Sequence, residues 1–282
     1  MTDSKAYRQG VTAMVSIASY NLHGGIDAWG RPFDAVESVR ALGADVIMLQ
    51  ECWTPAGQPG IAAEIAAAIG GTSHQVDLAS GRRALPHPKA PAAWQRRRSF
   101  VDGDHSLYLD SEMPMRASTR ESTRYAMAEP GAWGLAIVSK LPIRSTSVVP
   151  LGRLRRDRAT RAILVAHLDL DGTPMTAVAV HMTHLTYGSP RHFARLRREL
   201  RGLGGPTSAT VVGGDMNLWG PLVTAQLPGW HRAVTGRTWP SWGPHSQLDH
   251  LLVGRGFRVI GSRVGEDQSS DHLPVIARLQ LR

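Results

Sequence analysis

Short apolar segments rich in β-branched residues recur along almost the whole chain, and they limit what it can fold into. The first two read AMVSIASY and DVIMLQ, and each is bounded by polar or turn-forming residues. Segments of this length and composition are typical of buried strands. We predict strands at residues 13–20, 45–50, 133–139, 145–150, 162–168, 175–182, 209–213, 248–253, 257–264 and 274–281.

Three stretches carry helical patterns instead. Residues 31–42 have Pro32 near the start, apolar residues at three-residue spacing and Gly43 directly after, which predicts an amphipathic helix. Further helices are predicted at residues 61–69, before two glycines, and at 189–203, where a serine and a proline precede an apolar stripe. Many short strands with few helices predict an α+β sandwich rather than a regular alternation of strand and helix.

The 282 residues contain no internal repeat and no shift of composition that would mark a linker. We therefore predict one domain over residues 13–282, preceded by a disordered or loosely ordered N-terminus at residues 1–12. Sandwiches of this size commonly form a single unit. The stretch at about 80–130 is rich in Arg, Pro, His and Ser and lacks sustained periodicity, so we expect a long loop or insertion there.

The sequence has no recognisable export signal and no apolar stretch long enough to span a bilayer. Its single cysteine, Cys52, cannot build a disulfide framework, and a reducing compartment is consistent with that usage. We expect Cys52 to be a small buried apolar residue rather than a reactive thiol. These features favour a cytoplasmic protein, which we expect to be a monomer.

The formal net charge is +9, which favours polyanionic partners such as phosphate-rich substrates. The alternative is a compositional bias, because only three of the 32 basic residues are lysine and a GC-rich genome favours arginine, alanine and glycine. The arginines of residues 189–203 and the run at 95–98 are more typical of solvated surfaces than of a nucleic-acid grip. Charge alone therefore does not decide the function.

Polar motifs follow several predicted strands at the point where each strand ends. They are SYN at 19–21, LQE at 49–51, HMTHL at 181–185, GGDMN at 213–217, QLDH at 247–250 and SSDH at 269–272. Each motif alone is compatible with an ordinary turn or cap. Together they supply carboxylates, amides and imidazoles, which is the set of side chains that phosphodiester hydrolysis needs.

The chemistry of that reaction suggests a role for each side-chain type. A phosphodiester is an anion that repels nucleophiles, so a hard divalent cation held by carboxylates must neutralise it, and Glu51 suits that role. Asp215 is the candidate that aims and deprotonates water. Asn217, His184 and His272 can donate hydrogen bonds to the developing charge. Asp249 is a candidate to orient His272.

The ordered motifs SYN, QE, GLAIVS, THL, GDMN, LDH and SDH resemble those of the endonuclease/exonuclease/phosphatase superfamily, from Asn21 to Pro274. The resemblance implies a four-layered αββα sandwich, in which two packed mixed or antiparallel β-sheets are flanked by helices. It also implies that the active site lies at one end of the two sheets and uses Mg²⁺ or Mn²⁺.

The resemblance further implies a metal group, a catalytic group and a substrate-binding group. The metal group is Asn21, Glu51 and Asp271, with Asn21 binding the phosphate or a metal-bound water. The catalytic group is His184, Asp215, Asn217, Asp249 and His272, of which His184 contacts the scissile phosphate. Asn21, His184 and Asn217 also bind substrate. His181 is expected to be structural.

Some positions depart from the superfamily's pattern. Leu135 replaces a polar residue that many members carry, and His23 stands where some members place an acidic residue near the metal, which leaves the number of metal ions open. Tyr108 and Tyr125 lack the context of the tyrosine that abasic-site endonucleases use. Of the tryptophans before QLDH, we expect Trp239 to pack as part of a turn, whereas Trp242 is open to a role in base stacking.

We therefore expect a Mg²⁺- or Mn²⁺-dependent phosphodiester hydrolase that acts on nucleic acid, DNA or RNA, rather than on lipid. A phospholipid or sphingomyelin phosphodiesterase would share every catalytic residue, and a phosphomonoesterase on a small phosphorylated substrate is a third possibility. A catalytically inactive binding scaffold belongs to a different class, and the intact set of acidic and histidine residues argues against it.

Overall fold

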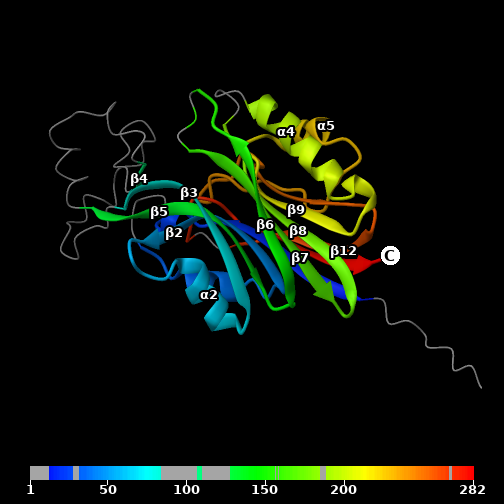
Figure 1. The fold of residues 1–282 in the computed structure, drawn as a ribbon, viewed down its shortest axis with the longest axis horizontal. Helices are drawn as coiled ribbons and strands as arrows, with labels where there is room; N and C mark the ends of the chain where they lie inside the picture. Colours follow the sequence, from blue (N-terminus) through cyan, green and yellow to red (C-terminus); the bar gives the residue numbers. More distant parts are fainter. Residues whose placement is uncertain are drawn as a thin grey trace, which may run out of the picture.

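A computed structural model describes residues 13–27, 32–83, 107–109, 128–155, 157, 159–184, 189–266 and 269–282. Two β-sheets pack face to face, with helices on the outer face of each (Figure 1). The expected αββα sandwich is therefore confirmed. Residues 1–12, which we expected to be loosely ordered, lie outside the described residues. Among the described residues, no helix combines the length and the apolar character that a membrane crossing requires.

The first sheet has the strand order β12-β13-β1-β2-β5-β3-β4. Its strands are β1 (Met14–Asn21), β2 (Val46–Pro55), β3 (Thr72–Arg83), β4 (Leu107–Leu109), β5 (Glu129–Ser139), β12 (Phe257–Val264) and β13 (Val275–Leu281). All neighbours are antiparallel except β1 and β2, which are parallel.

The second sheet has the order β10-β11-β9-β8-β7-β6. Its strands are β6 (Ile143–Gly152), β7 (Arg161–Leu170), β8 (Thr173–His181), β9 (Thr210–Asp215), β10 (His231–Arg232) and β11 (Asp249–Val253). Here β8 and β9 are the parallel pair. Each sheet is thus mixed, as expected.

Three apolar layers hold the sandwich together. The innermost lies between the sheets and joins Ile17 and Met48 of the first sheet to Leu164 of the second. A second layer packs α1 (Ala35–Arg40) and α2 (Ile61–Ile69) on the first sheet. The third packs α4 (Ser189–Gly202) and α5 (Gly220–Gln226) on the second sheet. Burial of one large apolar side chain in such a layer contributes about 1.5–3 kcal/mol.

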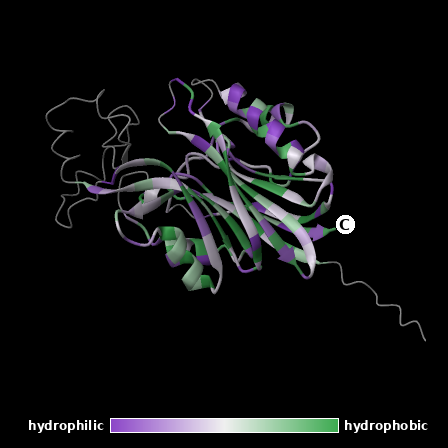
Figure 2. Cartoon of the chain, viewed as in Figure 1, coloured by the Kyte–Doolittle hydropathy of each residue, from purple (hydrophilic) through white to green (hydrophobic). Residues whose placement is uncertain are grey.

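The helices follow their sequence signals, with one correction. Predicted helix 31–42 is shorter, since α1 begins only at Ala35, where the Asp34 side chain accepts a 2.9 Å hydrogen bond from the Glu37 amide. Helix α2 ends as predicted, because Gly70 adopts a left-handed φ of 69°. Helix α4 carries both hydrophilic and hydrophobic residues (Figure 2), and its buried Phe193, Leu196 and Leu200 recur at the three- and four-residue spacing of an amphipathic helix.

The sequence did not predict α5 or β3. Helix α5 has only seven residues, and β3 is mostly half-exposed, so neither carries a strong apolar pattern. Strand β3 reaches into the stretch at about 80–130, where we expected a long loop or insertion. It extends to Arg83 and pairs with β4 and β5, and β5 begins at Glu129. The rest of that stretch lies outside the described residues.

Strand register brings the polar motifs to one edge of the sandwich. In the parallel pair β8 and β9, His181 lies opposite Asp215. The antiparallel pairing of β11 with β9 places Asp249 opposite the same Asp215. In the first sheet, Asn21 lies opposite Gln50, the neighbour of Glu51. Cys52 is fully buried, and burial raises its thiol pKa, as expected of a structural residue.

Candidate active site

Asn21 joins carboxylates from the two sheets. Its side-chain amide nitrogen donates to Glu51 Oε1 at 3.1 Å and to Asp215 Oδ2 at 3.3 Å. The backbone N–H of His23 donates to Asn21 Oδ1 at 3.0 Å. Because an N–H group needs an acceptor, this bond fixes which end of the amide faces the carboxylates. Asn21 therefore orients Glu51 and Asp215 through its NH₂ group.

Backbone strain gathers at this edge. His23, Glu51 and Asn217 have φ values of 47°, 54° and 47°, in the left-handed region that non-glycine residues avoid. Glu51 lies at a bulge in the pairing of β2 with β5. Asp215 Oδ1 stabilises the turn at Asn217 by accepting its backbone N–H at 2.8 Å. Such strain costs about 1–3 kcal/mol per residue and clusters at functional sites.

His272 is held as a cation beside Asp215. Its Nδ1 lies 2.8 Å from Oδ2 of the fully buried Asp249, and its Nε2 lies 3.8 Å from Asp215 Oδ2. Burial works to lower the pKa of His272, but Asp249, Asp271 and Asp215 outweigh it and raise that pKa well above its ordinary value. The imidazolium therefore presents an N–H donor to the site.

Asp215 is the carboxylate that all these groups surround. Burial raises its pKa to about 7, against the opposing charge of His272 and with added repulsion from Asp249 and Glu51. A carboxyl group with that pKa takes up and releases a proton near neutral pH. Asp215 can therefore act as a general base.

His181 lies on the other side of Asp215. Its Nε2 is 3.5 Å from Asp215 Oδ2, 3.9 Å from Glu51 Oε1 and 3.3 Å from the side-chain nitrogen of Asn217. Burial, together with the positive charges of Arg161 and His272, lowers the pKa of His181 well below its ordinary value. This histidine is therefore neutral where His272 is charged.

The structure places His181 and His184 differently with respect to Asp215. We expected His184 at the phosphate and gave His181 a structural role. The structure brings His181 to Glu51, Asp215 and Asn217, whereas His184 is exposed and lies three residues beyond the end of β8. The register with β9 ends at His181, so only that histidine is held opposite Asp215.

Asp271 joins the site through two histidines. Its Oδ1 lies 3.7 Å from His23 Nδ1. Burial opposes ionisation of Asp271, but His23 and His272 outweigh burial and lower the pKa of this carboxyl. In turn, Asp271 and Glu51 overcome the effect of burial on His23 and raise its pKa. Asp271, His23 and Glu51 thus belong to one electrostatic cluster.

The donor set fits a hard divalent cation. Glu51 retains 17% side-chain exposure and Asp271 retains 16%, so a cation has access to both carboxylates. Within the described part of the chain, no group of three or more His, Cys, Asp or Glu side chains is placed so that it could hold a metal ion. Mg²⁺ does not require such a group, because it commonly binds one or two carboxylates and completes its shell with water and substrate oxygens.

Two exposed tryptophans are close in sequence to residues connected with the cluster. Trp219 is 58% exposed and follows Asn217 by two residues. Trp242 is 43% exposed, and its neighbour Ser241 donates its backbone N–H to the Asp271 carbonyl at 2.8 Å. Trp239 instead lies with its ring 6.4 Å from the His272 ring. The sequence singled out Trp242 but not Trp219, although Trp219 stands two positions after the GGDMN motif.

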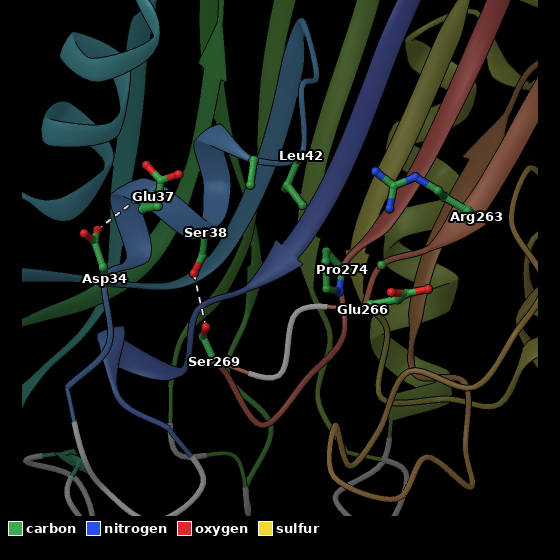
Figure 3. A pocket seen from close by; sticks show the side chains of 10 residues that line it. Asp34, Glu37, Ser38, Leu42, Arg263, Glu266, Ser269 and Pro274 are labelled. Carbon is green, nitrogen blue, oxygen red and sulfur yellow. Dashed lines mark hydrogen bonds between the residues drawn. The ribbon is translucent and has the colours of Figure 1, made fainter.

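A separate cavity of about 450 Å³ lies between α1 and the region of β12 and β13 (Figure 3). Asp34, Glu37 and Glu266 line it, with Arg263 as the basic residue of the lining. That lining repels a phosphate anion. The cavity shares Ser269 with the SSDH motif, and the Ser269 hydroxyl accepts a 3.2 Å hydrogen bond from Ser38. We therefore place the chemistry at the Asp215 cluster.

Structural comparison places the chain among known folds. It is similar to an endonuclease/exonuclease/phosphatase from Beutenbergia cavernae DSM 12333, with 20% identity and a TM-score of 0.60 over 95% of this chain and 72% of that one. It is also similar to the mannosyl-6-phosphatase Bt3783 of Bacteroides thetaiotaomicron VPI-5482, with 16% identity and a TM-score of 0.61 over 94% and 99%.

The human Nocturnin catalytic domain, solved with a bound sulfate anion, matches with 13% identity and a TM-score of 0.56 over 95% of each chain. No curated protein matches the sequence. At these identities the solved structures establish the fold alone. The family model described as Endonuclease/Exonuclease/phosphatase family, however, matches residues 18–272 and so spans every strand end that contributes to the Asp215 cluster. The chain therefore belongs to the endonuclease/exonuclease/phosphatase family of phosphoester hydrolases.

Proposed function

We propose that this chain is a Mg²⁺- or Mn²⁺-dependent phosphodiesterase that hydrolyses nucleic acid, DNA or RNA, by attack of water on phosphorus. The observation that carries the proposal is the pairing of a buried carboxylate and an imidazolium. Asp215, with its pKa raised to about 7, lies 3.8 Å from the Nε2 of cationic His272. A general base, Asp215, and a hydrogen-bond donor, His272, are thus close enough to act on the same phosphate.

In this proposal Asp215 takes a proton from the attacking water, whose oxygen bonds to phosphorus as the P–O bond to the leaving group breaks. The departing oxygen is protonated by solvent, and Asp215 returns its proton to solvent. His272, kept protonated by Asp249, donates from Nε2 to a phosphoryl oxygen as negative charge develops there. Asn217 and His181 bind the phosphate from the opposite side, and Asn21 keeps Asp215 and Glu51 in place. Glu51 and Asp271 would hold the cation. When bound, the cation neutralises the phosphate and stabilises the developing charge.

The proposed substrate class rests on charge and on aromatic residues. The net charge of +9 attracts polyanions, and the exposed Trp219 and Trp242 offer faces on which bases can stack. Stacking of one base on an aromatic side chain contributes about 1–3 kcal/mol. Trp219→Ala and Trp242→Ala should therefore raise KM for single-stranded nucleic acid roughly fivefold or more, and leave KM for a small aryl phosphodiester unchanged. Equal effects on both substrates would argue against stacking.

A phosphomonoesterase is the second candidate, because the similar protein from Bacteroides thetaiotaomicron is a mannosyl-6-phosphatase. A hydrolysis panel separates the candidates. It should contain an aryl phosphodiester, single- and double-stranded DNA, RNA, sphingomyelin, inositol phosphates and mannose 6-phosphate, each with Mg²⁺, with Mn²⁺ and with EDTA.

We expect cleavage of nucleic acid and of the aryl diester, abolished by EDTA and restored by either cation. Preference for lipid or for a monoester would replace the proposed substrate and leave the phosphoesterase chemistry in place. Full activity in EDTA would remove the metal from the mechanism.

A further inference from the structure

A buried ion pair lies directly behind His181. Arg161, the first residue of β7, binds Asp157 in a two-pronged contact, with Nε 3.0 Å from Oδ2 and Nη2 3.0 Å from Oδ1. The Arg161 side chain is 9% exposed and that of Asp157 is 1% exposed. Two charges are thus held together out of contact with solvent.

The remaining contacts of Arg161 lead to His181. Its Nη1 donates to the backbone carbonyl oxygen of His181 at 3.3 Å. Its guanidinium carbon lies 5.4 Å from the centre of the Trp133 ring, and that ring lies 5.0 Å from the imidazole of His181. One guanidinium therefore contacts both the backbone of His181 and the aromatic ring that supports its side chain.

Asp157 fixes the chain just beyond His181. The Thr183 hydroxyl donates to Asp157 Oδ2, and it also lies 2.6 Å from His192 Nδ1 on α4. Between His181 and Thr183, the carbonyl of Met182 accepts a 3.0 Å hydrogen bond from the Asn217 side chain. Arg161 thus holds the backbone of His181, and Asp157 holds Thr183. The Met182 carbonyl that binds the Asn217 side chain lies between these two points.

Packing alone does not explain a charged pair at this place. Arg161 contacts Trp133, which belongs to an apolar cluster with Leu78, Leu135, Ala159 and Ala162. A buried ion pair pays a large desolvation cost, and apolar residues of similar volume often replace such a pair without loss of stability. Its specific contacts with the active-site strand are what apolar residues would lack.

We propose that Arg161, fixed by Asp157, is a positioning residue that holds His181 and Asn217 against Asp215. The proposal rests on the proposed function only for its kinetic readout. Both side chains of the pair are buried, so we assign them no contact with the substrate. Misplacing an active-site group by about 1 Å can lower turnover by about 10²-fold, so loss of these contacts should be measurable in kcat.

The test replaces the pair by apolar residues in the full chain, as the double variant Arg161→Met, Asp157→Leu. We expect it to unfold cooperatively with a Tm at or above that of the wild type, yet to lose about 10-fold to 10²-fold in kcat towards an aryl phosphodiester. KM should change much less. Wild-type kcat in the folded double variant would overturn the proposal, and so would failure of this variant to fold.

Arg161→Lys tests the geometry separately, because lysine keeps the charge but lacks the planar fork. We expect the same loss of kcat in this variant, and full activity would show that charge alone suffices. Arg144→Met, Asp169→Leu is the matched control. This exposed pair lies near the far end of β7, and its loss should leave kcat unchanged.

A readout without turnover keeps this proposal distinct from the proposed function. The imidazole C–H resonances of His181 and His272 can be followed by NMR in the wild type and the double variant. We expect the His181 signal to move much further than that of His272. If the wild type hydrolyses no phosphoester, the proposed function fails, while the two resonances still decide whether Arg161 positions His181. An unmoved His181 signal would contradict the positioning role.

Discussion

Two histidines flank Asp215 in opposite electrostatic surroundings. His272 Nε2 and His181 Nε2 lie 3.8 Å and 3.5 Å from the same oxygen of Asp215. Both are buried, and burial alone disfavours a charge on either. Three carboxylates reverse that effect at His272, whereas Arg161 reinforces it at His181.

The difference shows that neighbours within a few ångströms set the role of each side chain. The chain carries a net charge of +9, yet the pKa of the buried His272 is raised well above its ordinary value because this histidine faces acidic residues. Coulomb interactions at contact distance exceed the screened field of distant surface charges. A cationic donor and a neutral imidazole can therefore coexist around one general base.

Substitution of Asp215 or of the cationic His272 should have the largest effect on kcat. Asp215→Ala and His272→Ala should each lower kcat by at least roughly 10²-fold, the scale for losing a base or a charge-stabilising donor. Because both act on one reacting group, the double variant should be little worse than either single variant. Steady-state kinetics on a phosphodiester measure this, with circular dichroism as the control for folding. Wild-type rates in both single variants would end the mechanistic assignment.

Substitution of the neutral His181 should lower kcat less. The same experiment distinguishes His181 from the nearby His184. His181→Ala should lower kcat by about 10-fold to 10²-fold, because a phosphate-binding group is lost. His184→Ala should leave kcat close to that of the wild type, since His184 lies beyond the strand end. The same kinetic assay compares them directly. A larger loss at His184 than at His181 would restore the assignment made from the sequence.

The pH profile should reveal the two charged groups separately. Asp215 must be ionised to accept a proton, so kcat/KM should fall as pH drops below its pKa of about 7. His272 must be protonated, and its pKa is raised. The value of kcat/KM should therefore also fall at high pH, as His272 loses its proton. Profiles from pH 5 to about 10 for the wild type and His272→Gln provide the measurement.

In His272→Gln the alkaline limb should disappear while the acidic limb remains. Raising the Mg²⁺ concentration should move the acidic limb to lower pH, because a nearby cation favours the ionised carboxylate. An alkaline limb that survives in His272→Gln would assign it to another group.

The smallest effect is expected at a third buried histidine outside the comparison. Burial lowers the pKa of His250 to about 4, and its Nε2 lies 3.0 Å from the Leu218 carbonyl oxygen. His250→Phe should lower the free energy of unfolding by about 1 kcal/mol through loss of that hydrogen bond. Urea denaturation measures this, and kcat should not change. A large loss of kcat in His250→Phe would show that a buried histidine affects catalysis without contacting Asp215, and would contradict this prediction.

The sequence by itself determined most of the described strands and the polar residues that end them, although it did not predict β3. Apolar runs with β-branched residues have few alternatives to a buried strand, so β1, β7 and β13 were predicted close to their observed bounds. The motifs also nominated Glu51, Asp215, Asp249 and His272, which the structure brings to one edge of the two sheets. Local composition was enough for these predictions because each depends on a short segment.

Tertiary structure alone decided which of two neighbouring histidines meets Asp215, and what lies behind it. That choice depends on the register of β8 against β9, and a shift of one residue would turn every side chain to the other face. The ion pair of Arg161 with Asp157 and the exposure of Trp219 likewise depend on contacts between distant segments. No local pattern encodes such contacts, because their free energy arises only when the two sheets and their helices pack together.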